Sequence, residues 1–108
     1  MSQNYQPDAP DRARIDAMDG PVVLDFGTNW CGHCDRARPL VDALMAAHPG
    51  VRHLRIEDAA GRRLGRSFGV KHWPTLVFLC RGTEIARVVR PTTAEDLTAA
   101  MTALEAAG

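Results

Sequence analysis

The chain has 108 residues, a length that suits one compact domain with a single core and leaves no room for a second catalytic module. Its 13 basic and 13 acidic residues give a formal charge of zero, so there is no long-range electrostatic reason to expect nucleic acid or an anionic membrane as a partner. No stretch approaches the roughly 20 apolar residues of a membrane span, and the polar N-terminus lacks the apolar run of a signal peptide. A cytoplasmic location is therefore expected.

The first half of the chain predicts a helix, a strand and a longer helix. Residues 1–10 are polar and contain two prolines, so we expect a disordered tail there and a single domain over residues 11–108. A short helix is expected around residues 11–18. Residues 22–26 (Val-Val-Leu-Asp-Phe) carry apolar side chains on both faces, which is typical of a buried strand. Residues 31–47 have helical spacing, with an apolar face made of Leu40, Val41, Leu44 and Met45.

The second half predicts three more strands and two helices. Residues 51–57 form a plausible strand, and Asp58 can cap a short helix that ends near Phe68, with Gly69 in a left-handed conformation. Residues 75–80 and 84–89 predict two strands joined by a hairpin. Thr92 and Glu95 have the spacing of a capping box that opens a last helix. The apolar face of this helix is made of Leu97, Ala100, Met101 and Leu104.

The order of these elements predicts an α/β fold. A strand–helix–strand unit favours a parallel pair of strands, and the closing hairpin adds an antiparallel pair. We therefore expect a central mixed β-sheet with helices on both sides.

Two of the three cysteines indicate redox chemistry. Three is too few for a scaffold held by structural disulfides, whereas Cys31 and Cys34 are separated by two residues where a strand passes into a helix. At the helix N-terminus, the free amides and the dipole favour a thiolate at Cys31, and the thiolate is the nucleophilic form. Cys34 lies one turn further on the same face, close enough for a reversible disulfide, and Gly32 leaves the turn open to an approaching chain. Cys80, in an apolar strand, is expected to be a buried and inert thiol.

His33 and Asp25 are candidates for tuning this pair. A partly protonated His33 would stabilise the reduced form and make the disulfide a stronger oxidant, although a solvated loop histidine is the alternative. A carboxylate inside a buried strand is costly unless it is paired or functional. Asp25 could therefore move the proton of Cys34, or it could be solvated on a half-exposed strand.

These residues together resemble the thioredoxin superfamily over residues 21–106. The resemblance rests on the strand carrying Asp25, the Trp30-Cys31-Gly32-His33-Cys34 motif, Pro39, Trp73-Pro74-Thr75 and Gly82. It implies a thioredoxin-like fold in which Cys31 attacks a substrate disulfide and Cys34 resolves the mixed disulfide. It also implies that Pro74 is cis and shapes a substrate groove with Trp73. We expect Gly32 and Trp30 to belong to the same substrate-binding surface, with Trp30 half-exposed and shielding the disulfide; a core anchor is the alternative for Trp30.

The resemblance implies no bound cofactor, substrate proteins with disulfides or thiols, and an upstream reductase or thiol pool. A monomer is expected. The sequence departs from the family pattern in several places. Gly32-His33 is similar to the disulfide isomerases, His53 replaces a lysine near Asp25, and Arg90 replaces a glycine after the last strand. Trp73 is bulkier than the usual aliphatic residue, and the N-terminus is short for a full leading strand and helix.

Several functions remain open from the sequence. A thioredoxin-like reductant in cell redox homeostasis is expected first, with a disulfide oxidant or isomerase as the alternative that His33 favours. A redox-responsive binding module without turnover is an alternative of another class. A zinc site would need about four ligands, and only Cys80, His33, His53 and His72 could join the cysteine pair, so no metal is expected.

Overall fold

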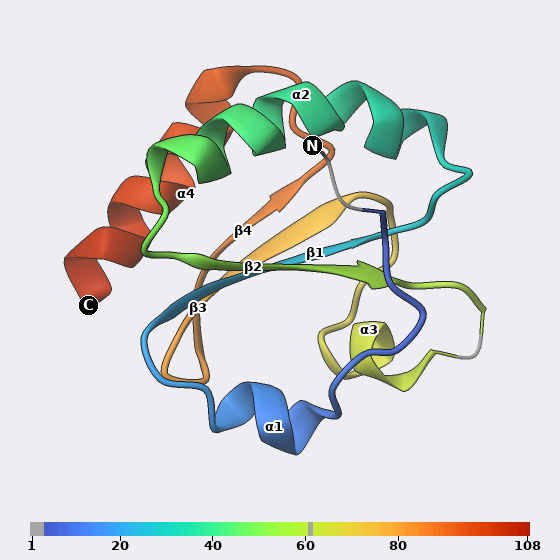
Figure 1. The fold of residues 1–108 in the computed structure, drawn as a ribbon, viewed down its shortest axis with the longest axis horizontal. Coiled ribbons are helices and arrows are strands. Elements are labelled where there is room, and N and C mark those ends of the chain that lie inside the picture. Colours follow the sequence, from blue (N-terminus) through green and yellow to red (C-terminus); the bar gives the residue numbers. More distant parts are fainter. Residues whose placement is uncertain (1–3, 61) are drawn as a thin grey trace.

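A four-stranded mixed sheet forms the centre of the molecule in the computed structural model, which describes residues 4–60 and 62–108 (Figure 1). The strands are β1 (Pro21–Gly27), β2 (Arg52–Glu57), β3 (Thr75–Cys80) and β4 (Thr83–Val89), in the order β2-β1-β3-β4. β1 pairs in parallel with β2, whereas β3 is antiparallel to both of its neighbours. The expected mixed sheet is confirmed.

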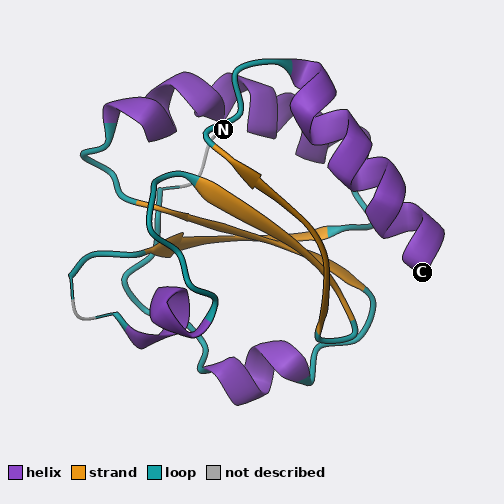
Figure 2. Ribbon diagram, turned by 180° about the vertical axis from the view of Figure 1, so that it is seen from behind, coloured by secondary structure: helices purple, strands orange, loops and turns teal. Residues whose placement is uncertain are grey.

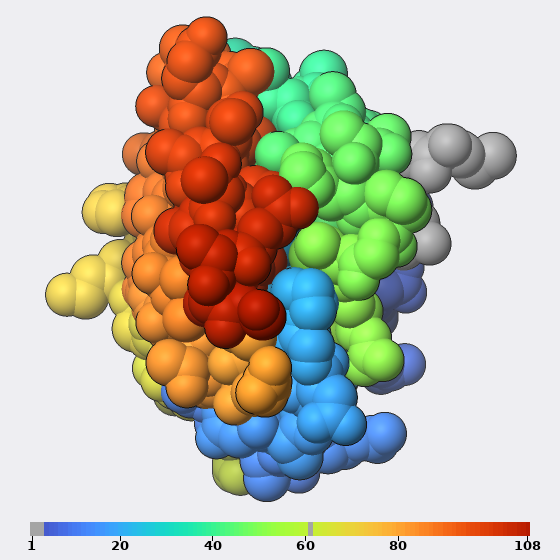
Figure 3. Space-filling view, turned by 90° about the vertical axis from the view of Figure 1, so that its left-hand side faces the viewer, coloured from blue at the N-terminus to red at the C-terminus, as the bar shows by residue number. Residues whose placement is uncertain are grey.

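Within the described residues, four helices cover the two faces of this sheet, as Figures 1 and 2 show in arrangement. α2 (Gly32–Ala47) and α4 (Ala94–Ala107) lie on one face, while the short α1 (Arg12–Asp16) and α3 (Arg63–Ser67) lie on the other. Figure 3 shows α4 packed alongside the C-terminal half of α2. Among the described residues, no helix combines the length and the apolarity that a bilayer crossing requires.

Alternation along β1 separates two apolar clusters. Val22, Leu24 and Phe26 face α1 and α3, whereas Val23 faces α2 and α4, because successive side chains of a strand point to opposite sides. The α1/α3 cluster also contains Ile15, Ile56, Leu64, Phe68, Val77 and Leu79. The α2/α4 cluster also contains Val41, Leu76, Phe78, Cys80, Leu97, Ala100, Met101 and Leu104. Both faces of β1 are therefore buried, as its apolar run predicts.

Two predicted helix caps are wrong. The last helix is capped by Thr93 and Asp96, one residue later than Thr92 and Glu95, and the carboxylate of Asp96 accepts hydrogen bonds from the backbone N–H groups of Thr92 and Thr93. Asp58 does not cap α3, whose N-cap is Arg62 without a side-chain hydrogen bond. The carboxylate of Asp58 instead accepts a hydrogen bond from the indole N–H of Trp73, at 2.9 Å. A tertiary partner has replaced the local one.

The expected disordered tail over residues 1–10 is corrected where the structure describes it. Tyr5 is only 3% exposed, and Gln6 forms a parallel bridge with Ile56 at the edge of β2. The N–H of Gln6 donates to Arg55 O at 3.0 Å, and the N–H of Glu57 donates to Gln6 O at 2.9 Å. The polar composition of this segment gave no sign that Tyr5 would be buried and would hold the segment against the sheet. Residues 1–3, the rest of the predicted tail, lie outside the described residues.

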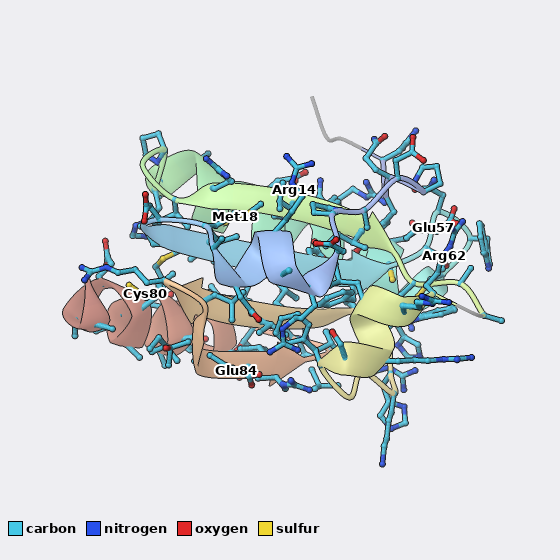
Figure 4. All side chains as sticks on the ribbon, turned by 90° about the horizontal axis from the view of Figure 1, so that it is seen from below. Arg14, Met18, Glu57, Arg62, Cys80 and Glu84 are labelled. Atoms are coloured by element: carbon cyan, nitrogen blue, oxygen red, sulfur yellow. The ribbon has the colours of Figure 1, made fainter. Side chains whose placement is uncertain are left out.

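Cys80 lies far along β3, at the end of the strand beside α4 (Figure 4). It is buried in the α2/α4 cluster, and its sulfur lies 4.0 Å from the carbonyl oxygen of Ala107. This placement agrees with a core thiol.

Candidate active site

Cys31 is the N-cap residue of α2, as the sequence predicts. Its backbone is extended, and its sulfur accepts a hydrogen bond from the backbone N–H of Cys34 at 3.2 Å. The side chain is half-buried, so a substrate sulfur can reach it from solvent. The sulfur takes the place of a capping oxygen at the N-terminus of a 16-residue helix, where backbone N–H groups point towards it.

Cys34 lies in a different environment one turn along. It is only 1% exposed, and all three cysteines are free thiols. Burial raises the pKa of Cys34 well above its ordinary value, the contact with Cys31 raises it further, and hydrogen bonds with Thr28 and Tyr5 oppose the shift. Cys34 is therefore held as a thiol, and it must lose a proton before it can act as a nucleophile.

Asp25, on β1, is only 1% exposed. Its carboxyl group accepts hydrogen bonds from the hydroxyl of Tyr5 at 2.9 Å and from Nε of Arg55 at 3.2 Å, and Nε2 of His53 lies 3.3 Å away. Arg55 is itself buried, and its Nη2 donates to Asp42 at 2.9 Å. The alternative of a solvated Asp25 is wrong: this carboxyl group belongs to a buried polar cluster with a guanidinium partner.

Two members of this cluster, Tyr5 and Arg55, were missed by sequence reasoning. Arg55 could have been found from strand register, because it pairs with Asp25 across the parallel β1 and β2. No local signal identifies Tyr5, since it stands in a polar segment 20 positions before Asp25. His53, the residue in place of the family's lysine, does reach Asp25, as its substitution suggested.

His33 lies exposed between the two cysteines, and a guanidinium nitrogen of Arg36 donates to its Nδ1 at 2.8 Å. The positive charge of Arg90 lowers the pKa of His33, and slight desolvation and the charge of Arg36 lower it further. The protonated fraction of His33 is therefore expected to be smaller than for a free histidine. The imidazole is more readily neutral than a free histidine, and the positive charge next to it comes from two arginines.

The peptide bond between Trp73 and Pro74 is cis, as the resemblance implies. Arg90 lies across them: its backbone N–H donates to Pro74 O and its Nε donates to Trp73 O, each at 2.9 Å. Arg90 has a φ of 51°, a left-handed conformation that glycine adopts more easily. The departure from the family's glycine therefore places a charged side chain on the backbone carbonyl before the cis-proline.

Of the remaining groove residues, Trp30 lies in the loop before α2 and Gly32 is the first residue of that helix. Trp30 is 66% exposed, so the alternative of a core anchor is wrong. A side chain added at Gly32 would meet only Arg36, in ordinary contact at 3.6 Å. Among residues 4–60 and 62–108, no group of three or more His, Cys, Asp or Glu side chains is arranged to hold a metal ion.

Comparisons with known proteins agree with this geometry. The thioredoxin family model matches residues 8–103, and the chain belongs to this family. It is 50% identical to thioredoxin 2 of Pseudomonas aeruginosa in its reduced form, with a TM-score of 0.88 and full coverage of both chains. It is also 39% identical to a thioredoxin of Chlamydia muridarum over 65% of this chain and 69% of that one.

The chain is thus a thiol–disulfide oxidoreductase of the protein-disulfide reductase type, a class that works through a redox-active disulfide without a cofactor. A weaker similarity runs to a disulfide isomerase. The chain is 39% identical to protein disulfide-isomerase erp38 of Neurospora crassa, over 54% of this chain and 17% of that protein.

Proposed function

We propose that the chain is a thioredoxin-like reductant of protein disulfides, with Cys31 as the attacking thiol and Cys34 as the resolving thiol. One observation carries this assignment: the two thiols have opposite environments. Cys31 caps a helix N-terminus and is half-buried, whereas Cys34 is buried and its pKa is raised. The first arrangement favours attack on an incoming disulfide, and the second reserves Cys34 for the internal step.

The reaction begins with the Cys31 thiolate attacking one sulfur of a substrate disulfide. A Cys31–substrate bond forms, the substrate S–S bond breaks, and the first substrate thiolate leaves. Trp30, Gly32, Trp73 and Pro74 surround the extended substrate chain. Arg90, which occupies the carbonyl of Trp73, must be displaced if the substrate uses that acceptor.

The second step closes the internal disulfide. Cys34 loses its proton towards Asp25 and attacks the Cys31 sulfur. The Cys31–Cys34 bond forms, the Cys31–substrate bond breaks, and the second substrate sulfur leaves as a thiolate that takes a proton from solvent. An upstream reductase or thiol pool then supplies two electrons to reduce the disulfide. A reducing compartment such as the cytoplasm suits this direction.

A disulfide oxidant or isomerase is the second candidate, which the Gly32-His33 pair and the similarity to an isomerase favour. The lowered pKa of His33 argues against a strongly oxidising couple, because a neutral imidazole gives less support to a thiolate. Equilibration in glutathione buffers distinguishes the two. A reduction potential near about −270 mV supports the reductant, and one near about −180 mV supports the oxidant or isomerase.

A redox-responsive binding module without turnover is tested by an insulin-type disulfide reduction assay. We expect brisk turnover by the wild type and none by Cys31→Ser. Cys80→Ser is the matched control, because this buried thiol lies beside the C-terminal helix (Figure 4) and pairs with Pro21 at the start of β1, whereas the cysteine pair follows the end of that strand. Absence of turnover by the wild type would contradict the proposed function and favour the binding module.

A further inference from the structure

Tyr5 occupies the space between the resolving thiol and the buried carboxyl group. Its hydroxyl donates to Oδ1 of Asp25 at 2.9 Å, and the same hydroxyl lies beside the sulfur of Cys34. A Cβ atom placed on Gly27 would lie 2.6 Å from the Cys34 sulfur and 2.8 Å from the Tyr5 oxygen. These two atoms therefore share one small buried space, which the missing side chain of Gly27 leaves open.

The position of Tyr5 is fixed from several directions. Its backbone N–H donates to Oδ1 of Asn29 at 2.8 Å, and Nδ2 of Asn29 donates back to its carbonyl at 3.2 Å. The next residue, Gln6, is hydrogen-bonded to both sides of Ile56 on β2. The guanidinium carbon of Arg38 lies 5.7 Å from the ring centroid. A side chain that only filled space would not need its hydroxyl to be aimed at a carboxyl group.

We propose that Tyr5 relays the proton of Cys34 to Asp25 during the resolving step. The Cys34 thiol gives its proton to the Tyr5 oxygen while the Tyr5 hydroxyl gives its own proton to the Asp25 carboxylate. Cys34 becomes a thiolate, Asp25 becomes a carboxylic acid and Tyr5 ends unchanged, so protons and charge balance. This proposal rests on the proposed function, because it assigns a role within the step in which Cys34 attacks Cys31.

The chemistry of Tyr5 suits a relay better than a base. Burial raises the pKa of Tyr5, and the charge of Asp25 raises it further, so the phenol stays protonated throughout. It can give up a proton only while it receives another. The direction of proton transfer is then set by the two ends of the relay: the Cys34 thiol, which must ionise, and the Asp25 carboxylate, which is hydrogen-bonded to Tyr5.

The test is a single-turnover measurement of substrate thiol release from the Cys31 mixed disulfide, across pH 6 to 9, with wild type and Tyr5→Phe. Removal of the hydroxyl should slow this step at pH 7 by at least about tenfold. This lower bound is conservative, because a general acid–base group usually contributes about 10²–10⁴-fold. The variant should recover as pH rises, because Cys34 then ionises to solvent. Alkylation of Cys31 by iodoacetamide should be unchanged.

Two controls separate a relay from a packing effect. Tyr5 is the one tyrosine of the chain, so growth with 3-fluorotyrosine labels it alone, keeps the hydroxyl and should preserve both the rate and the pH profile. The effects of Tyr5→Phe and Asp25→Asn should be non-additive if both act in one relay, and the double variant should be no slower than Asp25→Asn. Additive losses with parallel pH profiles would overturn the relay.

The two proposals fail in different ways. If the wild type turns over substrate while Tyr5→Phe keeps its rate and pH profile, the relay is wrong and the proposed function stands. If the wild type does not reduce disulfides, the proposed function is wrong as well. If Tyr5→Phe does not fold, the fluorotyrosine protein still provides a test, because it keeps the packing and the hydroxyl while its phenol is more acidic. Loss of the resolving step in that protein would contradict the relay.

Discussion

The two faces of β1 differ in what they contribute: one is purely apolar, whereas the other carries a buried carboxyl group and a glycine. Towards α1 and α3, the strand presents Val22, Leu24 and Phe26 to an apolar cluster. Towards α2, its last three alternate positions are Val23, Asp25 and Gly27, and the latter two contact the resolving thiol and its polar neighbours. One face stabilises the fold by burial, whereas the other accepts a buried charge and a missing side chain in order to place a carboxyl group near Cys34.

The largest effect is expected from the cysteine pair, which should alter activity without altering the fold. Cys31→Ser should lower insulin-type turnover by at least about 10³-fold, as removal of a nucleophile does in other covalent enzymes. Cys34→Ser should instead trap the Cys31–substrate disulfide, detectable by mass spectrometry. Both variants should unfold in urea close to the wild-type midpoint. A trapped adduct on Cys34 in the Cys31→Ser protein would reverse the assigned roles.

Arg55 and Ile56 are neighbours on β2 that point to opposite faces, and they compare the two faces directly. Arg55→Leu removes the guanidinium partner of Asp25 and should cost about 3–5 kcal/mol of unfolding free energy, because a buried group loses its charged partner. Ile56→Val, on the apolar face, should cost about 0.5–1.5 kcal/mol. Urea denaturation measures both, and equal costs would contradict the difference between the faces.

Gly27 tests the close approach of Cys34 and Tyr5. Gly27→Ala would place a methyl group 2.6 Å from the Cys34 sulfur and should cost about 1–3 kcal/mol through overpacking. Gly50→Ala is the matched control, since no heavy atom lies within 4 Å of its added Cβ. It should change stability by less than about 1 kcal/mol. Similar losses in both variants would mean that Gly27 matters only for the chain's flexibility.

The smallest effect concerns the pKa of His33. Its pKa in the folded protein is lowered chiefly by Arg90, so the folded state disfavours the protonated imidazole, and this effect appears as pH falls through the ordinary histidine range. Arg90→Gly should raise the pKa of His33 towards its ordinary value. Arg36→Ala, which removes a smaller cause, should raise it less. An NMR titration of the ring protons checks the order of the two shifts.

The sequence determined the elements and the reactive centre, because those depend on local spacing. The two-residue gap of Cys31 and Cys34 at a helix start placed both sulfurs, and the period-2 and helical patterns located every strand and helix within a few residues. The capping residues were less predictable, because Asp58 found a better partner in Trp73 than in the helix it precedes. A local donor and a distant one compete for the same carboxylate, and only packing decides between them.

Tertiary structure alone decided what surrounds Asp25. The strand register brings Arg55 opposite Asp25 from 30 positions away, and the start of the chain returns along β2 to place Tyr5 between Asp25 and Cys34. No local pattern encodes such contacts, since each depends on how whole elements pack. The sequence by itself thus specified where the two neighbouring thiols lie, and the fold decided which groups surround them.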